Sequence, residues 1–110
     1  MRKLAFVLAA SAALSSPALA GYDGLWNVSV TTTRGSCDSA STNFSVSNGT
    51  VTSRDPAYQA SGQVDPAGSV VVSLVGPHGQ ATASGRLDDA AGYGVWRGGP
   101  CAGTWTAQRR

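Results

Sequence analysis

The feature that most constrains the fold is a series of short segments in which apolar and polar residues alternate, each ended by a tight turn. Between Leu25 and Thr33, Trp26, Val28 and Val30 occupy every second position, with polar residues between them. Side chains of a β-strand point alternately to its two faces, so this pattern predicts a strand with one buried face. Val, Thr and aromatic residues supply most apolar positions, which favours strands, and Glu is absent throughout.

The strongest turn signal is Asn48-Gly49, which lies between the alternating segments Asn43–Ser47 and Thr50–Ser53. A type I′ turn needs a positive φ at both central residues, and Asn followed by Gly meets that need. A two-residue turn makes Val46 face Val51, which places the apolar side chains of both strands on the same face. The pattern and the turn therefore predict the same hairpin.

Further turns rich in Gly, Pro and Asp divide the rest of the chain in the same way, and they give eight strands in all. The predicted strands are Leu25–Thr33, Asn43–Ser47, Thr50–Ser53, Tyr58–Val64, Ser69–Val75, Ala81–Leu87, Tyr93–Arg97 and Cys101–Arg109. Ser69–Val75 has Val or Leu on both faces and is expected to be the most buried strand. The high Gly and Ser content is also typical of disordered chains, but the regular alternation argues against disorder.

The first twenty residues have the pattern of a secretory signal peptide. Arg2 and Lys3 form a positive start, Leu4–Leu14 is apolar, and Ala18–Ala20 has the small residues of a cleavage site. We therefore expect residues 1–20 to be removed, leaving residues 21–110 as a single exported domain, periplasmic or secreted. The apolar run is too short for a transmembrane segment, and no second run follows it.

Removal of Arg2 and Lys3 leaves six Arg and six Asp, so the mature side-chain charge is zero. A nucleic-acid-binding protein would show a basic face, and a protein that binds membrane surfaces through charge would show a polybasic segment. The charge balance argues against both classes. We expect a monomer of about 90 residues with a small core.

The two cysteines, Cys37 and Cys101, are expected to form one disulfide, because exported chains fold in oxidising compartments. A redox or metal-binding pair would be expected to show a CxxC spacing and a nearby His, and the chain has neither. In an up-and-down meander, the end of the first strand at Thr33 and the start of the eighth lie at the same rim. Pairing of those two strands would bring the cysteines together, so the bridge favours a closed barrel over an open, strongly curved sheet.

Three Gly-x-Trp triplets recur, at Gly24–Trp26, Gly94–Trp96 and Gly103–Trp105. A Gly beside a large ring helps to fit an aromatic side chain into a small, strongly curved barrel. Two interpretations remain open: the rings pack the core near a rim, or they line a cavity for a ligand.

The segments Tyr22–Trp26, Arg34–Cys37 and Cys101–Arg110 resemble a group of small exported proteins common in soil and plant-associated bacteria. Members of that group are mostly uncharacterised, and some carry a loose heme-utilisation or adhesion label, so the resemblance implies export and no defined activity. More distantly, the Gly-x-Trp opening, the single disulfide and the eight strands resemble avidin- and lipocalin-like barrels and periplasmic metalloprotease inhibitors. The chain departs from the inhibitor pattern, in which the disulfide would close a short loop.

Few residues suggest chemistry. His78 is the only histidine and lies in a Gly/Pro turn, so a solvated loop residue is the simple interpretation. A heme site would need His78 as an axial ligand, without a second His, Met or free Cys in the mature chain to assist it. Asp88-Asp89 lacks the spaced oxygen ligands of a calcium loop. We predict no catalytic residues, no metal site and no cofactor, and expect Arg109-Arg110 to cap the last strand.

Two functions are consistent with these features, both of them non-enzymatic. The sequence-based prediction is a protein-interaction or inhibitor module with a packed interior, which would contact an unknown partner through Arg34–Ser41 and Gly76–Gln80. The alternative is a carrier of a small apolar ligand, heme-like or other, held between Trp26, Trp96 and Trp105. The inward faces are rich in Ala and Gly, which fits either a cavity or a tight barrel.

Overall fold

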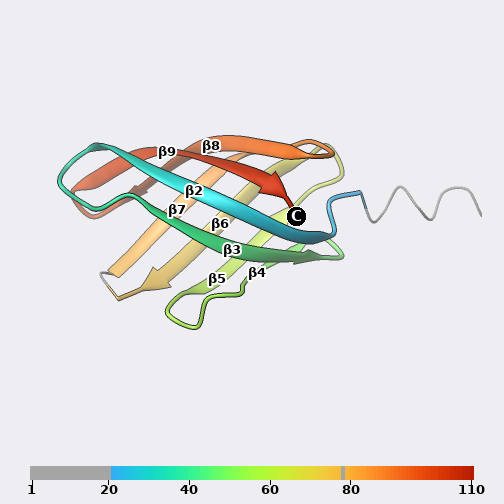
Figure 1. Cartoon of the computed structure of the whole chain (residues 1–110), viewed down its shortest axis with the longest axis horizontal. Helices are drawn as coiled ribbons and strands as arrows, with labels where there is room; N and C mark the ends of the chain where they lie inside the picture. The colour runs from blue at the N-terminus through green and yellow to red at the C-terminus, as the bar shows by residue number, and fades with distance from the viewer. Residues whose placement is uncertain (1–20, 78) are drawn as a thin grey trace, which may run out of the picture.

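The computed structural model describes residues 21–77 and 79–110, which form a closed antiparallel barrel of eight strands (Figure 1). Each strand pairs with its neighbour in the sequence, and the last pairs with the first. The strands are β2 (Gly24–Arg34), β3 (Ala40–Ser47), β4 (Thr50–Ser53), β5 (Gln59–Val64), β6 (Ser69–Gly76), β7 (Gly79–Leu87), β8 (Ala91–Gly98) and β9 (Cys101–Arg109). The predicted fold is confirmed, and the expected signal peptide at 1–20 lies outside the described residues.

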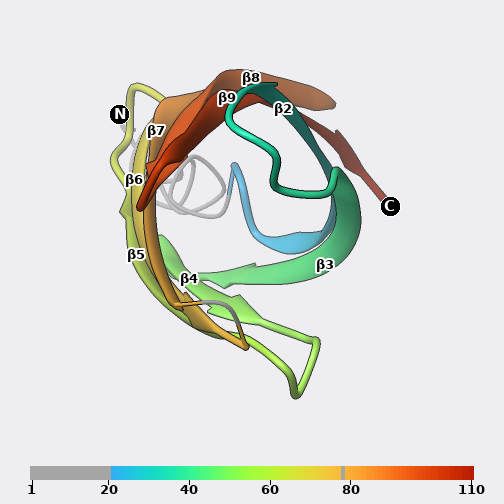
Figure 2. The ribbon, with the colours of Figure 1, turned by 90° about the vertical axis from the view of Figure 1, so that its left-hand side faces the viewer.

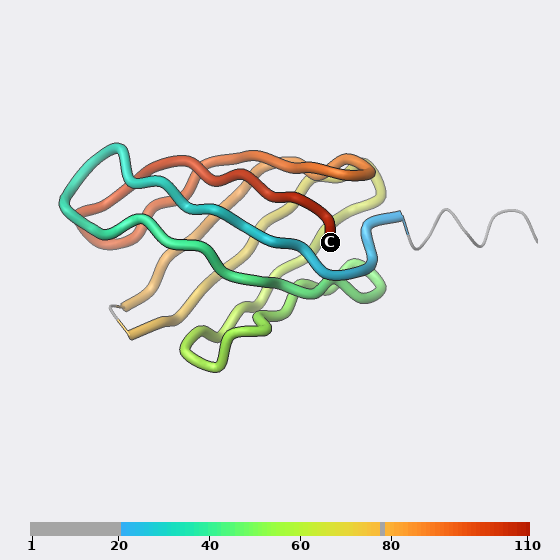
Figure 3. Tube along the Cα trace, in the orientation of Figure 1, coloured from blue at the N-terminus to red at the C-terminus, as the bar shows by residue number. Residues whose placement is uncertain are grey.

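Local turn chemistry sets the register of the β3–β4 hairpin as the sequence predicts. Asn48 and Gly49 have φ values of 51° and 79°, and Val46 pairs with Val51. The predicted turn at Asp65 is also present, since the Gly68 N–H donates to the Asp65 carbonyl at 2.9 Å. Figure 3 shows that these two turns lie at the same end of the barrel as the C-terminus.

Closure of the barrel rests on the long pairing of β2 with β9, which runs from Trp26 opposite Arg109 to Arg34 opposite Ala102. The register shifts by one residue between Thr32 and Arg34. Just beyond this irregularity, the Cys37–Cys101 disulfide joins the β2–β3 loop to the start of β9, with the two Cα atoms 6.2 Å apart. The predicted pairing of the cysteines and the closure that it favoured are both confirmed.

The buried core occupies one half of the barrel. Its side chains come from the first halves of β2, β4 and β6 and from the last halves of β3, β5, β7 and β9. Its members are Trp26, Phe44, Val46, Val51, Val64, Val70, Val72, Leu87, Trp105 and Ala107. In the other half, most inward side chains outside β9 are only half-buried, so the two ends of the barrel differ.

The expectation that Ser69–Val75 is the most buried strand is wrong. Its outer face is solvated, with Val71 63% and Val75 46% exposed. The most buried strand is β9, in which Cys101 and every second residue as far as Ala107 are buried. Both strands have a solvated outer face, but in β6 the inward residues Leu74 and Gly76, near the open end, are only half-buried.

No helix in residues 21–77 and 79–110 is long and apolar enough to cross a membrane.

Candidate functional site

An apolar cavity of about 690 Å³ occupies the interior of the barrel. It reaches from the buried core to the opposite end, where Cys37, Pro77 and Pro100 lie around its mouth. Figure 2 looks at the barrel from that end and shows the β2–β3 loop crossing part of the opening. A pocket of a few hundred Å³ lined mainly by apolar side chains is typical of sites for small ligands.

The cavity exists because the inward side chains in the open half of the barrel are small. Ala81 and Ala83 of β7 and Ala40 of β3 lie on its wall, each no larger than a methyl group. An eight-stranded barrel is just wide enough for side chains to fill it or for one small ligand to enter it. With Ala on the inner wall, this barrel remains hollow.

Arg109, at the far end of β9, lies behind the cavity, on the Trp26 ring that forms part of its lining. Its guanidinium donates hydrogen bonds of 2.7 Å to the backbone carbonyls of Gly21 and Asp23. A third bond, also of 2.7 Å, goes to the carbonyl of Asp89 in the β7–β8 turn. The guanidinium also lies over the ring of Trp26, 5.2 Å from its centroid. Arg109 therefore ties the N-terminal segment across this end of the barrel.

Trp96 and Trp105 cover one side of the cavity wall, and we call this pair the tryptophan panel. Trp105 of β9 is paired with Gly94 of β8, and Trp96 of β8 is paired with Gly103 of β9. A Cβ atom built on Gly94 or Gly103 would lie 2.7 or 2.8 Å from the ring of its paired tryptophan. Each ring thus occupies the space that the opposite glycine leaves.

The indole N–H groups fix both rings against the wall. Trp105 Nε1 reaches across β8 to the backbone of β7 and lies 3.3 Å from the Ser84 carbonyl and 3.1 Å from that of Val95. Trp96 Nε1 extends in the other direction and donates to the Thr31 carbonyl of β2 at 3.0 Å. Because the N–H groups are used in this way, the panel offers the cavity only its aromatic surface.

Few polar groups line the cavity. Asp38 is the only charged residue among the described residues that line it, and it lies at the mouth on the β2–β3 loop. Deeper inside, Thr42 of β3 is half-buried, and its Oγ1 has no hydrogen-bond partner. The interior therefore suits an apolar molecule and offers very few hydrogen bonds to it.

The disulfide holds one side of the mouth in place. Gly35 of the β2–β3 loop packs so closely on the bridge that an added Cβ would lie 2.7 Å from Cys101 Sγ. Gly35 has a φ of 87°, which a larger residue would adopt only with strain. The loop and the start of β9 therefore form one tightly joined rim.

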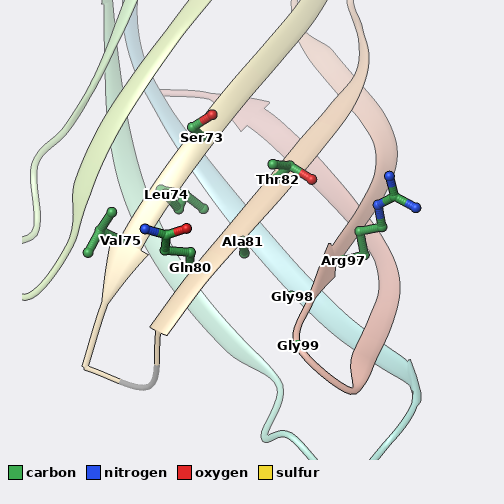
Figure 4. A pocket seen from close by; sticks show the side chains of 9 residues that line it. All are labelled: Ser73, Leu74, Val75, Gln80, Ala81, Thr82, Arg97, Gly98 and Gly99. Atoms are coloured by element: carbon green, nitrogen blue, oxygen red, sulfur yellow. The ribbon is translucent and has the colours of Figure 1, made fainter.

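A second hollow, of about 520 Å³, lies at the same rim, where β7 and β8 diverge beyond the pair Thr82 and Arg97 (Figure 4). It shares five lining residues with the main cavity: Leu74, Gln80, Ala81, Gly98 and Gly99. The Arg97 side chain in Figure 4 points away from β7. This hollow forms a notch in the wall beside the mouth.

The residues that sequence reasoning singled out meet at this site to different degrees. All three tryptophans line the cavity: Trp26, Trp96 and Trp105. Trp26 and Trp105 also belong to the buried core, whereas Trp96 is half-buried. The rings therefore both pack the core and line a cavity. Cys37 and Cys101 lie at the mouth. His78 lies outside the described residues, so its role as a ligand stays a prediction.

Two features of the site were not predicted from the sequence. Arg109 was expected only to cap the last strand, yet it ties the N-terminal segment across this end of the barrel; its position opposite Trp26 follows once β2 and β9 are aligned. Thr42 gave no signal, because an inward Thr looks like any other Thr on a Ser/Thr-rich strand.

No family model matches this chain, and neither a curated protein nor a solved structure matches it. The geometry of the cavity is therefore the feature that bears on function.

Proposed function

We propose that this protein is a non-enzymatic carrier that binds a small apolar molecule inside its barrel. The observation that carries the proposal is the cavity of about 690 Å³, apolar along its walls and open at one end. Water in such a space finds few hydrogen-bond partners, so replacing it with an apolar ligand is favourable. The ligand would contact the tryptophan panel and the small side chains of β7.

The cavity supports this alternative over the interaction module that the sequence favoured. The module requires a packed interior, so that only the rim loops Arg34–Ser41 and Gly76–Gln80 carry function. A hollow interior has no structural benefit for such a module, since unfilled apolar space costs stability. For a carrier, the same space is the binding site.

We propose further that the carrier works in the periplasm or outside the cell. The Cys37–Cys101 disulfide supports an oxidising compartment, and the pattern of residues 1–20 supports export.

A native mass spectrum of protein purified without detergent from the cells that make it tests the proposal first. A retained small mass that is lost on unfolding supports a carrier. Bare protein is then titrated with N-phenyl-1-naphthylamine and decan-1-ol, two uncharged apolar probes. Failure of both probes to bind would overturn the proposal.

A matched pair of variants tests whether the probes bind inside the barrel. Ala83 points into the cavity, whereas the next residue, Ser84, is exposed on the outer wall. Ala83→Trp should fill the cavity and weaken binding at least about tenfold, while Ser84→Trp should leave it unchanged. Equal effects of the two substitutions would place the binding elsewhere on the protein.

A further inference from the structure

The lining of the cavity and the way the tryptophan panel is fixed carry an inference about the chemical class of the ligand, which rests on the proposed function. The main question is whether the ligand is charged. A charge moved from water into an apolar site must be paired or hydrogen-bonded there, or binding is lost.

The described residues that line the cavity include no Arg or Lys. Their one charged member, Asp38, is acidic and lies at the mouth, so it would repel an anion that entered. Arg97, at the same rim, lines the notch and points away from β7 in Figure 4. An anionic group carried into the cavity would therefore be buried without a cationic partner, and one left at the mouth would lie near Asp38.

The shape of the ligand follows from the panel. The Trp105 ring extends from β9 over Gly94 and on to Gly85 of β7, where an added Cβ would also lie 2.7 Å from the ring. The Trp96 ring extends the other way, over Gly103 towards β2. Each ring covers the backbone of neighbouring strands and is held by its N–H group, so together they give the cavity a broad aromatic surface. Such a surface gains most from a ligand that has a flat ring of its own.

We propose that the ligand is an uncharged molecule with a flat aromatic or fused-ring portion, which lies against Trp96 and Trp105. A linear fatty acid is charged and has no flat ring, so it meets neither requirement. Heme has a flat ring but carries two carboxylates, so it meets the requirement of shape and not that of charge.

Two matched pairs of probes test charge and shape separately by isothermal titration calorimetry of the folded protein. N-phenyl-1-naphthylamine and 1-anilinonaphthalene-8-sulfonate share a skeleton and differ by one sulfonate. 1-Naphthalenemethanol and decan-1-ol are alcohols of similar size, one with a flat ring and one with a chain. We expect the uncharged naphthylamine to bind at least about tenfold more tightly than the sulfonate, and the ring alcohol to bind more tightly than the chain alcohol.

Substitution of the panel links the ring preference to its surface. Trp96→Leu should lower the ratio of ring-alcohol to chain-alcohol affinity at least about threefold. Tyr93→Leu, on the outer wall where Tyr93 is 65% exposed, should leave that ratio unchanged. If Trp96→Leu does not fold, Trp96→Phe keeps an aromatic ring without the N–H group and should retain a weakened preference.

The outcomes separate this inference from the proposed function. Equal or tighter binding of the sulfonate, or of the chain alcohol, overturns the inference and leaves the carrier in place. Absence of binding by all four probes removes the carrier, and the inference with it.

Discussion

Trp105 and Gly94 are cross-strand partners, and the ring of the first lies where the side chain of the second would be. Trp96 and Gly103 repeat the arrangement two residues further along the same pair of strands, with the roles of β8 and β9 exchanged. In each Gly-x-Trp triplet, the glycine therefore packs against the tryptophan ring of the other triplet. This exchange explains why the two triplets recur in neighbouring strands.

The exchange predicts that Gly94→Ala is costly although Ala is small. The new Cβ would meet both the Ser84 carbonyl and the Trp105 ring, so β8 or the ring must shift. Overpacking of this kind costs about 1–3 kcal/mol. Urea denaturation should show a loss of that size, together with a changed near-ultraviolet circular dichroism signal from tryptophan. Val95→Ala, at an exposed neighbouring position, is the control, and a cost of Gly94→Ala as small as that of the control would contradict the prediction.

Removal of the Arg109 guanidinium should destabilise the end of the barrel at which β9 finishes. Arg109→Met keeps much of the aliphatic stem but loses three hydrogen bonds to backbone carbonyls and the contact with Trp26. We expect a loss of about 2–4 kcal/mol in the free energy of unfolding. Arg110→Met, at the exposed next position, should change stability little. Equal stability of the two variants would show that Arg109 does not hold this end closed.

The disulfide should supply a large part of the stability. Cys37 and Cys101 are separated by 64 residues, and closing a loop of that length stabilises a folded chain by about 4 kcal/mol in the chain-entropy model. The double variant Cys37→Ser/Cys101→Ser should therefore melt well below the parent under oxidising conditions. Wild-type protein reduced with dithiothreitol should behave like the variant. An unchanged melting temperature would refute this account of the bridge.

The Thr42 hydroxyl should lower the stability of the fold. Its Oγ1 is buried without a hydrogen-bond partner, and such a group costs about 1–3 kcal/mol. Thr42→Val replaces the hydroxyl with a methyl group of similar size and should raise the free energy of unfolding by about 1 kcal/mol. Thr106→Val on the exposed face of β9 measures the effect of Val in a strand by itself. A stabilisation no larger than that of Thr106→Val would argue against an unpaired hydroxyl.

Asp88 should make stability fall in acid. Its carboxylate accepts hydrogen bonds from the N–H groups of Ala90 and Ala91, at 2.9 and 2.8 Å, and these bonds hold the pKa of Asp88 below its ordinary value of 3.8. A lowered folded-state pKa gives stability that is present above that ordinary value and is lost as the pH falls through the folded-state pKa. Asp88→Asn keeps an acceptor oxygen that does not titrate, so its unfolding free energy should decline less steeply below pH 3.8. Parallel curves for variant and wild type would contradict the assignment.

Local sequence determined the strands and most of the turns. Alternation in segments such as Leu25–Thr33 sets which side chains point inward, because successive residues of a strand face opposite ways. The Asn48-Gly49 turn fixes its hairpin register, because few other residue pairs accept two positive φ values. The cysteine positions even favoured closure, since only a closed barrel brings the two ends of the meander together.

Only the tertiary structure decided whether the interior is hollow. The inward residues Ala81 and Ala83 are compatible with a narrow, packed barrel or with a cavity, and the choice depends on how far apart the walls stand once all eight strands have paired. The same holds for Arg109, whose partners in the chain come from the N-terminal segment and the β7–β8 turn, and for Gly94, whose partner is Trp105. Sequence patterns report which face a side chain occupies. Which residues lie opposite that face depends on the pairing of strands far apart in the sequence. In this protein that pairing determines the cavity and the residues that line it.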